Sequence, residues 1–242
     1  MLTLDMVETA REIASKLDIP ECFGCDNDGD LEDGFLESQL DSFYAGNYSI
    51  NNGISKVAII FYDLPFVLKI PFNGHWEYDY EYDAEHDEWY DTEEPRFNYF
   101  YCARAYDSSD YCWNELDKVE LAQDRGYGEL LADMADVYTD ANGRHFYIQE
   151  KVLPLHEASS VVSKPSNDSL KKAQSMDSIY NSCNVEWRAS VIEHYGEQFW
   201  ISFVNWNESG DLGYLEDMHG GNYGYRYDGT PVLFDVAGYR DD

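Results

Sequence analysis

Hydrophobic and polar positions along the chain repeat with two periods, and the longer period predicts three helices. Apolar residues recur every three to four positions over residues 4–17, which end before Pro20. The same spacing holds over residues 109–125, with Gly126 as a stop signal, and over residues 185–204. Each stretch is predicted to be a helix with one face in a core.

The shorter period, of two residues, predicts strands. Residues 56–62 and 66–70 are rich in apolar and β-branched residues, and the short link between them predicts a hairpin. Asn142-Gly143 predicts a second hairpin, between residues 135–139 and residues 145–152. Two polar stretches remain: an acidic loop over residues 21–38 and a Ser/Lys/Asn/Asp-rich stretch over 156–182, expected to be a mobile connector.

Residues 75–94 hold ten acidic residues, six aromatic residues and no lysine or arginine. Aromatic and acidic residues alternate strictly from Trp76 to Asp83, which predicts a strand with one aromatic face and one anionic face. Two interpretations stay open. The strand is either a solvated edge whose charge blocks sheet-to-sheet aggregation, or a docking surface for lysine and arginine residues of a partner.

The net charge narrows the classes of function. The chain has 242 residues, with 48 Asp and Glu against 16 Lys and Arg, and a formal net charge of −32. Direct binding to nucleic acid or to anionic membranes needs basic residues, so both are disfavoured, and a basic partner or mimicry of a polyanion is favoured. Abundant aromatic residues argue against disorder. An odd number of cysteines, with no signal peptide and no apolar run of membrane-spanning length, predicts a cytoplasmic protein.

The most informative segment lies near the C-terminal end of the sequence. Asp228-Gly229 predicts a two-residue hairpin turn between strands near 223–227 and 231–235. Continued along both strands, this register sets Asn222 opposite Asp235, with their Cβ atoms about 4.5–5.5 Å apart. An amide and a carboxylate are oxygen ligands of the kind that Mg²⁺ takes, so both residues are predicted metal ligands.

The order of these residues resembles the protein-kinase-like fold. The kinase catalytic loop has an Asp followed five residues later by an Asn, and Asp217 and Asn222 have this spacing, with His219 between them. Asp235 stands where the kinase Asp-Phe-Gly falls. The resemblance implies that Asp217 orients the hydroxyl group of the substrate, that His219 lies near the γ-phosphate, and that Asn222 and Asp235 bind Mg²⁺.

The resemblance extends upstream. Phe66-Val-Leu-Lys69 is similar to the strand whose lysine contacts ATP, and Gly53 lies where the glycine-rich loop is expected. The resemblance implies that Lys69 holds the α- and β-phosphates and pairs with Glu115, for which Glu120 is the competing residue. The segment 146–152, with Glu150 and Val152, looks like the hinge strand that receives adenine.

The fold expected from the resemblance is α+β and two-lobed, with a β-sheet N-lobe and a truncated, minimal C-lobe. The segments would be a helix and acidic loop over 1–38, the N-lobe over 39–152 with its insertion at 75–94, and the C-lobe over 153–242. The sequence departs from the kinase pattern in having one loop glycine rather than three, and Leu215-Glu216 before the catalytic Asp.

Three functions are compatible with these features. Asp-Met-His-x-Gly-Asn is most similar to the small early serine/threonine protein kinases of short-tailed phages, which implies an ATP- and Mg²⁺-dependent enzyme acting on host proteins in host takeover or anti-defence, in the host cytoplasm. An inactive kinase-like protein could instead inhibit a basic, nucleic-acid-binding host protein by mimicking DNA. The Asp-x-His-x-x-Asn core also resembles small-molecule phosphotransferases.

Overall fold

The structure is a computed structural model of the chain in which helices and mostly antiparallel strands occupy separate stretches. The α+β class expected from the sequence is therefore confirmed. The structure describes residues 1–25, 34–53, 55–77, 80–83, 86, 88–91, 95–99, 111–158, 162–176, 183–208 and 221–236.

Contacts between residues divide the chain into two compact units, which we name the sheet unit and the helical unit. The three-part division expected from the sequence is not tested by these contacts and stays a prediction. The sheet unit comprises Leu2–Asn114 and Ala135–Gln149, and the helical unit comprises Met1, Glu115–Met134 and Glu150–Asp242.

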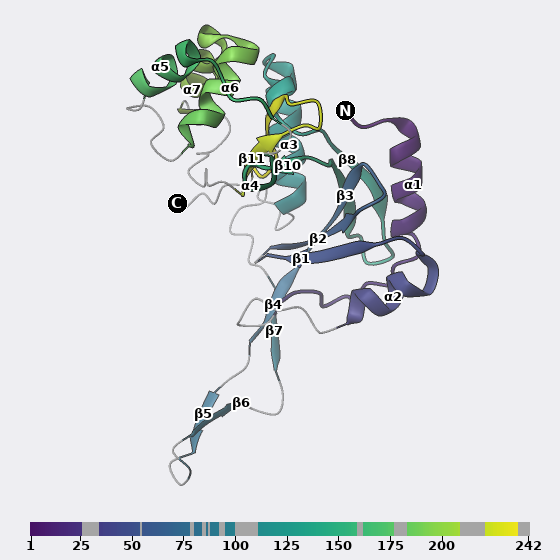
Figure 1. The fold of residues 1–242 in the computed structure, drawn as a ribbon. Helices are drawn as coiled ribbons and strands as arrows, with labels where there is room; N and C mark the ends of the chain where they lie inside the picture. Colours follow the sequence, from purple (N-terminus) through teal and green to yellow (C-terminus); the bar gives the residue numbers. More distant parts are fainter. Residues whose placement is uncertain are drawn as a thin grey trace. The chain divides into compact units, whose positions relative to one another are not determined.

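The main sheet of the sheet unit has five strands in the order β1-β2-β3-β9-β8, so β3 is central (Figure 1). Both predicted hairpins are confirmed. Ile60 pairs with Val67 across the first, and Gly143 takes a φ of 79° in the turn of the second, a conformation that favours glycine. The strands are β1 (Tyr48–Asn52), β2 (Lys56–Phe61), β3 (Phe66–Pro71), β8 (Met134–Thr139) and β9 (His145–Glu150).

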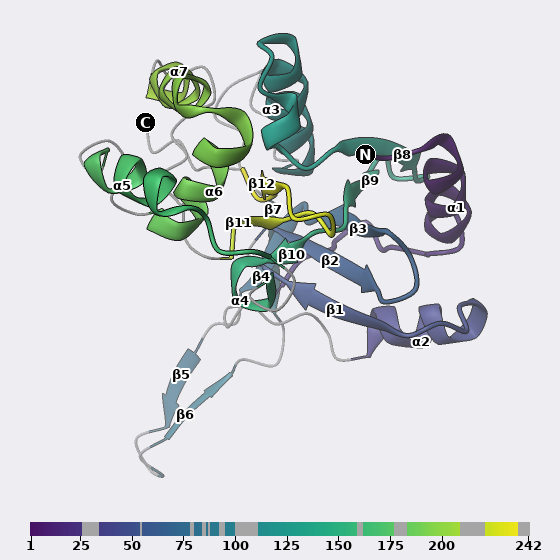
Figure 2. The same ribbon diagram turned by 45° about the horizontal axis from the view of Figure 1, so that its top comes forward.

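Two helices, α1 (Leu4–Ala14) and α2 (Phe35–Phe43), cover one face of this sheet (Figure 2). Every second residue of β2, β3 and β9 contributes to the core beneath them, as the period of two requires. The core residues on these strands are Val57, Ile59, Phe61, Phe66, Leu68, Ile70, Phe146 and Ile148.

The first predicted helix is confirmed as α1, but α2 was not expected, because its first turn falls within the predicted acidic loop over 21–38. The apolar stripe of α2 is short: Leu36 and Leu40, one turn apart, are both fully buried. Phe35 and Phe43 pack against the same core, but the helix has only nine residues and directly follows an acidic stretch, so the stripe did not stand out in the sequence.

The acidic segment forms paired strands rather than one long strand. β4 (Gly74–Glu77) pairs with β7 (Arg96–Tyr99), and β5 (Tyr80–Asp83) pairs with β6 (Glu88–Asp91), both antiparallel (Figure 1). The predicted alternation therefore lies on β4 and β5, and the return strands were missed. No Asn-Gly or Asp-Gly signal marks their turn.

The helical unit has a core in which aromatic residues of two helices pack on a small three-stranded sheet, β10-β11-β12. Trp187 is fully buried there, and its indole N–H donates to the Gly224 carbonyl at 2.8 Å. Gly224 is required, because a Cβ atom would lie 2.0 Å from the carbonyl oxygen of Leu153 on the neighbouring strand. The elements are α3 (Tyr111–Asp124, in this unit from Glu115), η1 (Gly128–Leu130), β10 (Leu153–Pro154), α4 (Leu155–Ala158), α5 (Asn167–Ser175), α6 (Val185–Tyr195), α7 (Glu197–Glu208), β11 (Tyr223–Tyr225) and β12 (Pro231–Leu233).

Two expectations for this unit are wrong. The stretch over 156–182, expected to be a mobile connector, contains most of α4 and all of α5, and α5 packs against α6 (Figure 2). The Ser166 hydroxyl caps α5 by accepting the backbone N–H of Ser169. The single helix expected over 185–204 is two helices, because Gly196 takes a φ of 98° and ends α6.

Among the residues that the structure describes, no helix combines the length and the apolar character needed to cross a membrane.

Candidate functional site

Lys69 lies on the central strand of the sheet, on the face opposite the α1–α2 core. Its neighbours Leu68 and Ile70 belong to that core, so the alternation of a strand places Lys69 on the second face. Lys69 is nevertheless only 5% exposed. Because an ammonium group is costly to bury without a partner, this position is built around the charge of the lysine.

The second face of the sheet carries further buried polar side chains. Phe146 and Ile148 of β9 lie in the core, so Tyr147 and Gln149 share the second face with Lys69, on the strand beside β3. Tyr147 is fully buried and Gln149 is 5% exposed. An amine, a phenol and an amide thus occur on one face of two neighbouring strands.

Gly53 lies at the tip between β1 and β2, where its N–H donates to the Lys56 carbonyl at 2.9 Å. A Cβ atom at this position would meet only that carbonyl oxygen, at 3.9 Å, and the backbone has no positive φ. Glycine is therefore not required here by the fold of the hairpin itself. Its position, at an exposed tip before the strand that pairs with β3, is where the resemblance expects a phosphate-covering loop.

Asn222 and Asp235 lie beside each other at the open end of the β11–β12 hairpin. The Asn222 carbonyl accepts the N–H of Phe234 at 3.0 Å and that of Asp235 at 3.4 Å. Asn222 is 7% exposed, whereas Asp235 is partly exposed. The structure thus brings the two residues together through their backbones, with Asn222 in the protein interior and Asp235 in reach of solvent.

The register that brings them together differs from the prediction by one residue. Tyr223 pairs with Leu233, so Asn222 stands opposite Phe234 rather than opposite Asp235. Because side chains alternate between the faces of a ladder, this shift means that Asn222 and Asp235 are not a directly opposed pair. They are neighbours because the Asn222 carbonyl accepts the N–H groups of both Phe234 and Asp235, beyond the end of β12.

The shift comes from the turn, which has three residues instead of two. Arg226 donates its N–H to the Thr230 carbonyl at 2.8 Å and accepts the N–H of Gly229 at 2.9 Å. The Asp228 carboxylate accepts the N–H of Thr230 at 2.9 Å, and Gly229 takes a φ of 88°. This is the three-residue hairpin loop in which a glycine follows a tight turn, and the Asp228 side chain stabilises it.

Glu115 of α3 is fully buried, whereas Glu120, the competing acid on the same helix, is exposed. A buried carboxylate needs a positive or hydrogen-bonding partner, and an exposed one does not. Burial therefore favours Glu115 as the functional acid of this helix. One turn further along α3, the ammonium group of Lys118 donates to the Val236 carbonyl at 2.7 Å.

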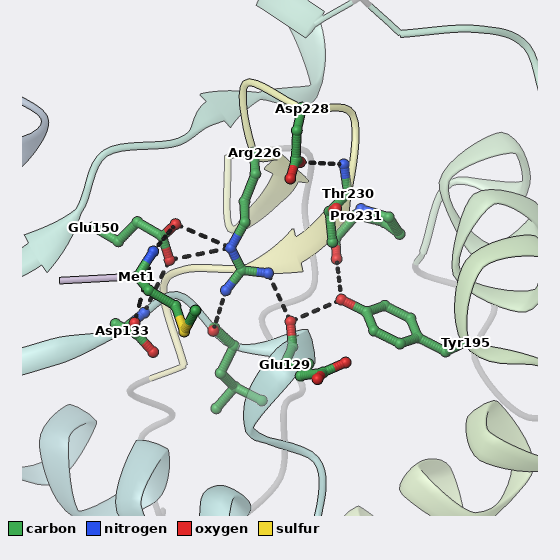
Figure 3. A network of polar contacts seen from close by, with 10 residues as sticks. Met1, Glu129, Asp133, Glu150, Tyr195, Arg226, Asp228, Thr230 and Pro231 are labelled. Carbon is green, nitrogen blue, oxygen red and sulfur yellow. Dashed lines mark hydrogen bonds and ion pairs between the residues drawn. The ribbon is translucent and has the colours of Figure 1, made fainter.

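Glu150 takes part in an ion-pair network that the sequence did not indicate (Figure 3). The Arg226 Nε–H donates to both oxygens of the Glu150 carboxylate, at 3.0 and 3.1 Å. The other guanidinium nitrogens of Arg226 donate to the carbonyls of Glu129 at 2.7 Å and Leu131 at 2.9 Å. The Tyr195 hydroxyl donates to the same Glu129 carbonyl at 2.7 Å. Arg226 thus joins β9, η1 and the C-terminal hairpin.

The environment of this network favours a charged Glu150 carboxylate and a neutral Tyr195 phenol. Burial acts to raise the pKa of the Glu150 carboxyl, but hydrogen bonds from Arg226 and from the amino group of Met1 outweigh it and leave that pKa below its ordinary value. The Met1 amino nitrogen lies 2.7 Å from the Glu150 carboxylate and 3.7 Å from that of Asp133. Burial raises the pKa of the Tyr195 phenol to about 12, so it remains a hydrogen-bond donor.

The network bears on the predicted adenine-binding strand. Both carboxylate oxygens of Glu150 accept hydrogen bonds, and its backbone N–H donates to the Asp133 carbonyl at 2.8 Å. Any role of Glu150 toward a nucleotide therefore falls to its backbone carbonyl rather than to its side chain. Val152 is partly buried between β9 and β10. Arg226 was missed because a lone arginine beside a turn resembles a solvated surface residue.

Two predicted catalytic residues, Asp217 and His219, lie outside the described residues. Of the predicted metal ligands, the described pair offers one amide oxygen and one carboxylate, which fits Mg²⁺, an ion that takes few protein ligands and usually keeps several waters. Among the described residues, no cluster of three or more His, Cys, Asp and Glu side chains could hold a metal ion. The chemistry of the pair thus suits a metal ion that is shared with phosphate oxygens.

The chain matches no protein-family model, and comparisons with curated proteins and with solved structures gave no match.

Proposed function

We propose that the protein is an ATP- and Mg²⁺-dependent serine/threonine protein kinase of the phage type, with a kinase-like two-lobed fold, that acts on host proteins. The observation that supports this most directly is the burial of Lys69 on the central strand of a five-stranded sheet. Two further observations agree with it: Glu115 is buried on the helix that follows in the chain, and Asn222 adjoins Asp235.

Each residue has a role in this proposal. Lys69 would bind the α- and β-phosphates, and Glu115 is the acid that the resemblance pairs with it. Asn222 and Asp235 would hold Mg²⁺, which would supply positive charge against the phosphates. Asp217 accepts the proton of the substrate hydroxyl. Phosphoryl transfer depends on positioning and charge neutralisation rather than on covalent chemistry, so these few groups suffice.

ATP with Mg²⁺ is expected to raise the thermal unfolding midpoint of the protein. At nucleotide concentrations one hundredfold above Kd, linkage gives about 2.7 kcal/mol, or about 5–10 °C for a chain of this length. Lys69→Met should abolish the shift, measured against the midpoint of the same variant without nucleotide. Lys16→Met, which removes an exposed lysine just after the end of α1, is the matched control and should keep the full shift.

Transfer itself is measured by incubating the protein with γ-labelled ATP, Mg²⁺ and host extract. Wild-type protein should label serine and threonine residues, and Asp217→Ala should not. If wild type labels no more protein than Asp217→Ala, the proposed function is wrong. Labelling of amino-alcohols in place of protein would instead support a small-molecule phosphotransferase.

A second candidate function is inhibition of a basic, nucleic-acid-binding host protein through the acidic strands. The register of β5 with β6 pairs Asp83 with Glu88, so two acidic residues stand at opposed positions of the ladder. Like charges in opposed positions destabilise a ladder, so folding stability does not account for this arrangement. A surface that presents carboxylates to the lysines of a partner would account for it.

Neutralising these acids should release such a partner. In a pull-down from host extract, wild type is expected to retain a host protein that duplex DNA displaces. A variant with Glu81→Gln, Asp83→Asn and Glu88→Gln should not retain that protein. The matched control neutralises three exposed acids of the same unit, Glu8, Glu12 and Asp18, and should keep the partner. Equal retention by both variants would contradict this candidate.

A further inference from the structure

Lys118 connects α3 to the chain immediately after Asp235. Its ammonium group donates to the carbonyl of Val236 at 2.7 Å, a short hydrogen bond of the charge-assisted kind. Lys118 is the only lysine or arginine of α3. Both ends of this bond lie in the helical unit.

The carbonyl that Lys118 holds is fixed by packing as well. The Val236 side chain is 3% exposed and lies in the same core cluster as Val119 and Ala122, the buried apolar residues of α3. Val236 thus shares a core with α3 and also accepts a hydrogen bond from the only lysine of that helix. Val236 cannot move away from α3 without losing both contacts.

Asp235 is held less firmly on its other side. It lies beyond the end of β12, outside the regular ladder, and its N–H reaches the Asn222 carbonyl only at 3.4 Å. A hydrogen bond of this length is weak compared with the usual 2.9–3.0 Å. The bond from Lys118 to Val236 is shorter than this direct hydrogen bond and restrains the chain after Asp235, as the Phe234 N–H at 3.0 Å from the Asn222 carbonyl restrains it before.

We infer that Lys118 is a positioning residue for the metal ligand Asp235 and that it makes the position of α3 part of the metal site. This inference rests on the proposed function. Lys118, Val236 and Asp235 all lie in the helical unit. A displacement of α3 therefore moves the Val236 carbonyl and, with it, the backbone of Asp235.

Lys118→Met removes the donor and keeps most of the side-chain stem, whereas Lys118→Arg keeps a donor. In the protein without nucleotide or metal, Lys118→Met should raise the hydrogen-exchange rates of the Phe234 and Asp235 amides about tenfold, the effect of losing one charge-assisted hydrogen bond. With ATP, it should raise the Mg²⁺ concentration for the half-maximal thermal shift by about 10- to 100-fold, as residues that orient metal ligands do. Lys118→Arg should restore both values toward wild type.

The matched control is Lys172→Met, which removes a half-exposed lysine of α5 in the same unit, where it pairs with Glu197 at 3.3 Å. It should change neither readout. If wild type shows the Mg·ATP shift and Lys118→Met matches it within twofold in both readouts, the positioning role is overturned and the proposed function stands. If wild type shows no Mg·ATP shift, the proposed function is overturned, and the role of Lys118 with it.

Discussion

Asp235→Asn is expected to lower the rate of Mg²⁺-dependent phosphoryl transfer by about 10²–10³-fold, the usual cost of removing one preorganised charge-stabilising group. The substitution keeps the shape of the side chain and the backbone N–H that the Asn222 carbonyl accepts. What it removes is the negative charge, which an ion with few protein ligands needs most. The measurement is the initial rate of transfer from γ-labelled ATP over a series of Mg²⁺ concentrations.

Asp228→Asn is the matched control for this substitution. It makes the same chemical change in the turn of the same hairpin, where the amide oxygen of asparagine can still accept the N–H of Thr230. Its activity should stay within twofold of wild type. Equal activity of Asp235→Asn and Asp228→Asn would show that the carboxylate of Asp235 does not bind the metal.

Arg226→Met is expected to lower the free energy of unfolding by about 3 kcal/mol at pH 7, because it leaves the Glu150 carboxylate buried without its main partner. The two side chains are 14% and 11% exposed, so solvent screens their interaction only weakly. The carbonyls of Glu129 and Leu131 lose donors as well. The expected fall in the unfolding midpoint is about 6–12 °C, measured by thermal or urea denaturation.

The effect of Arg226→Met should depend on pH with a definite sign. The pKa of Glu150 is lowered in the folded protein, so the ion pair contributes its full stability above the unfolded value of about 4.3. That contribution is lost as the pH falls through the lowered pKa, and the difference between variant and wild type should shrink there.

The control for this prediction is Arg96→Met. Arg96 pairs with Glu77 at 3.1 Å, but its side chain is 67% exposed, so solvent screens the pair and the loss of stability should be small. A stability loss in Arg226→Met no larger than that in Arg96→Met would contradict a structural role for the network. The double variant Arg226→Met/Glu150→Gln should recover part of the lost free energy of unfolding, because the carboxylate charge that Arg226 paired with is then absent.

Local signals were sufficient where one short stretch determines its own geometry. The period of two over β2 and β3 predicted the strand that carries Lys69, and Asn142-Gly143 predicted the hairpin of β8 and β9. Such patterns succeed because alternation and positive φ are properties of neighbouring residues. In the sequence, Lys69 also interrupts an apolar run between Leu68 and Ile70, a position where a buried partner is expected.

The sequence did not reveal features that depend on a partner elsewhere in the chain. The last hairpin turn has three residues rather than two, and the Asp228 side chain stabilises it. The register is therefore shifted by one residue, so the Asn222 carbonyl accepts the N–H of Asp235 and the two residues are not an opposed pair. Gly196 divides a continuous apolar pattern into two helices, because its backbone conformation overrides the period.

What the sequence by itself determined is the set of chemical groups and their order: a lysine on a strand, an acid on a helix, and an amide and a carboxylate around a hairpin. Only the tertiary structure distinguishes Glu115, which is buried, from Glu120, which is exposed, since burial depends on packing against distant residues. It also assigned the Glu150 side chain to Arg226 and the Val236 carbonyl to Lys118. These contacts join residues 76 and 118 positions apart, a separation at which no local pattern carries information.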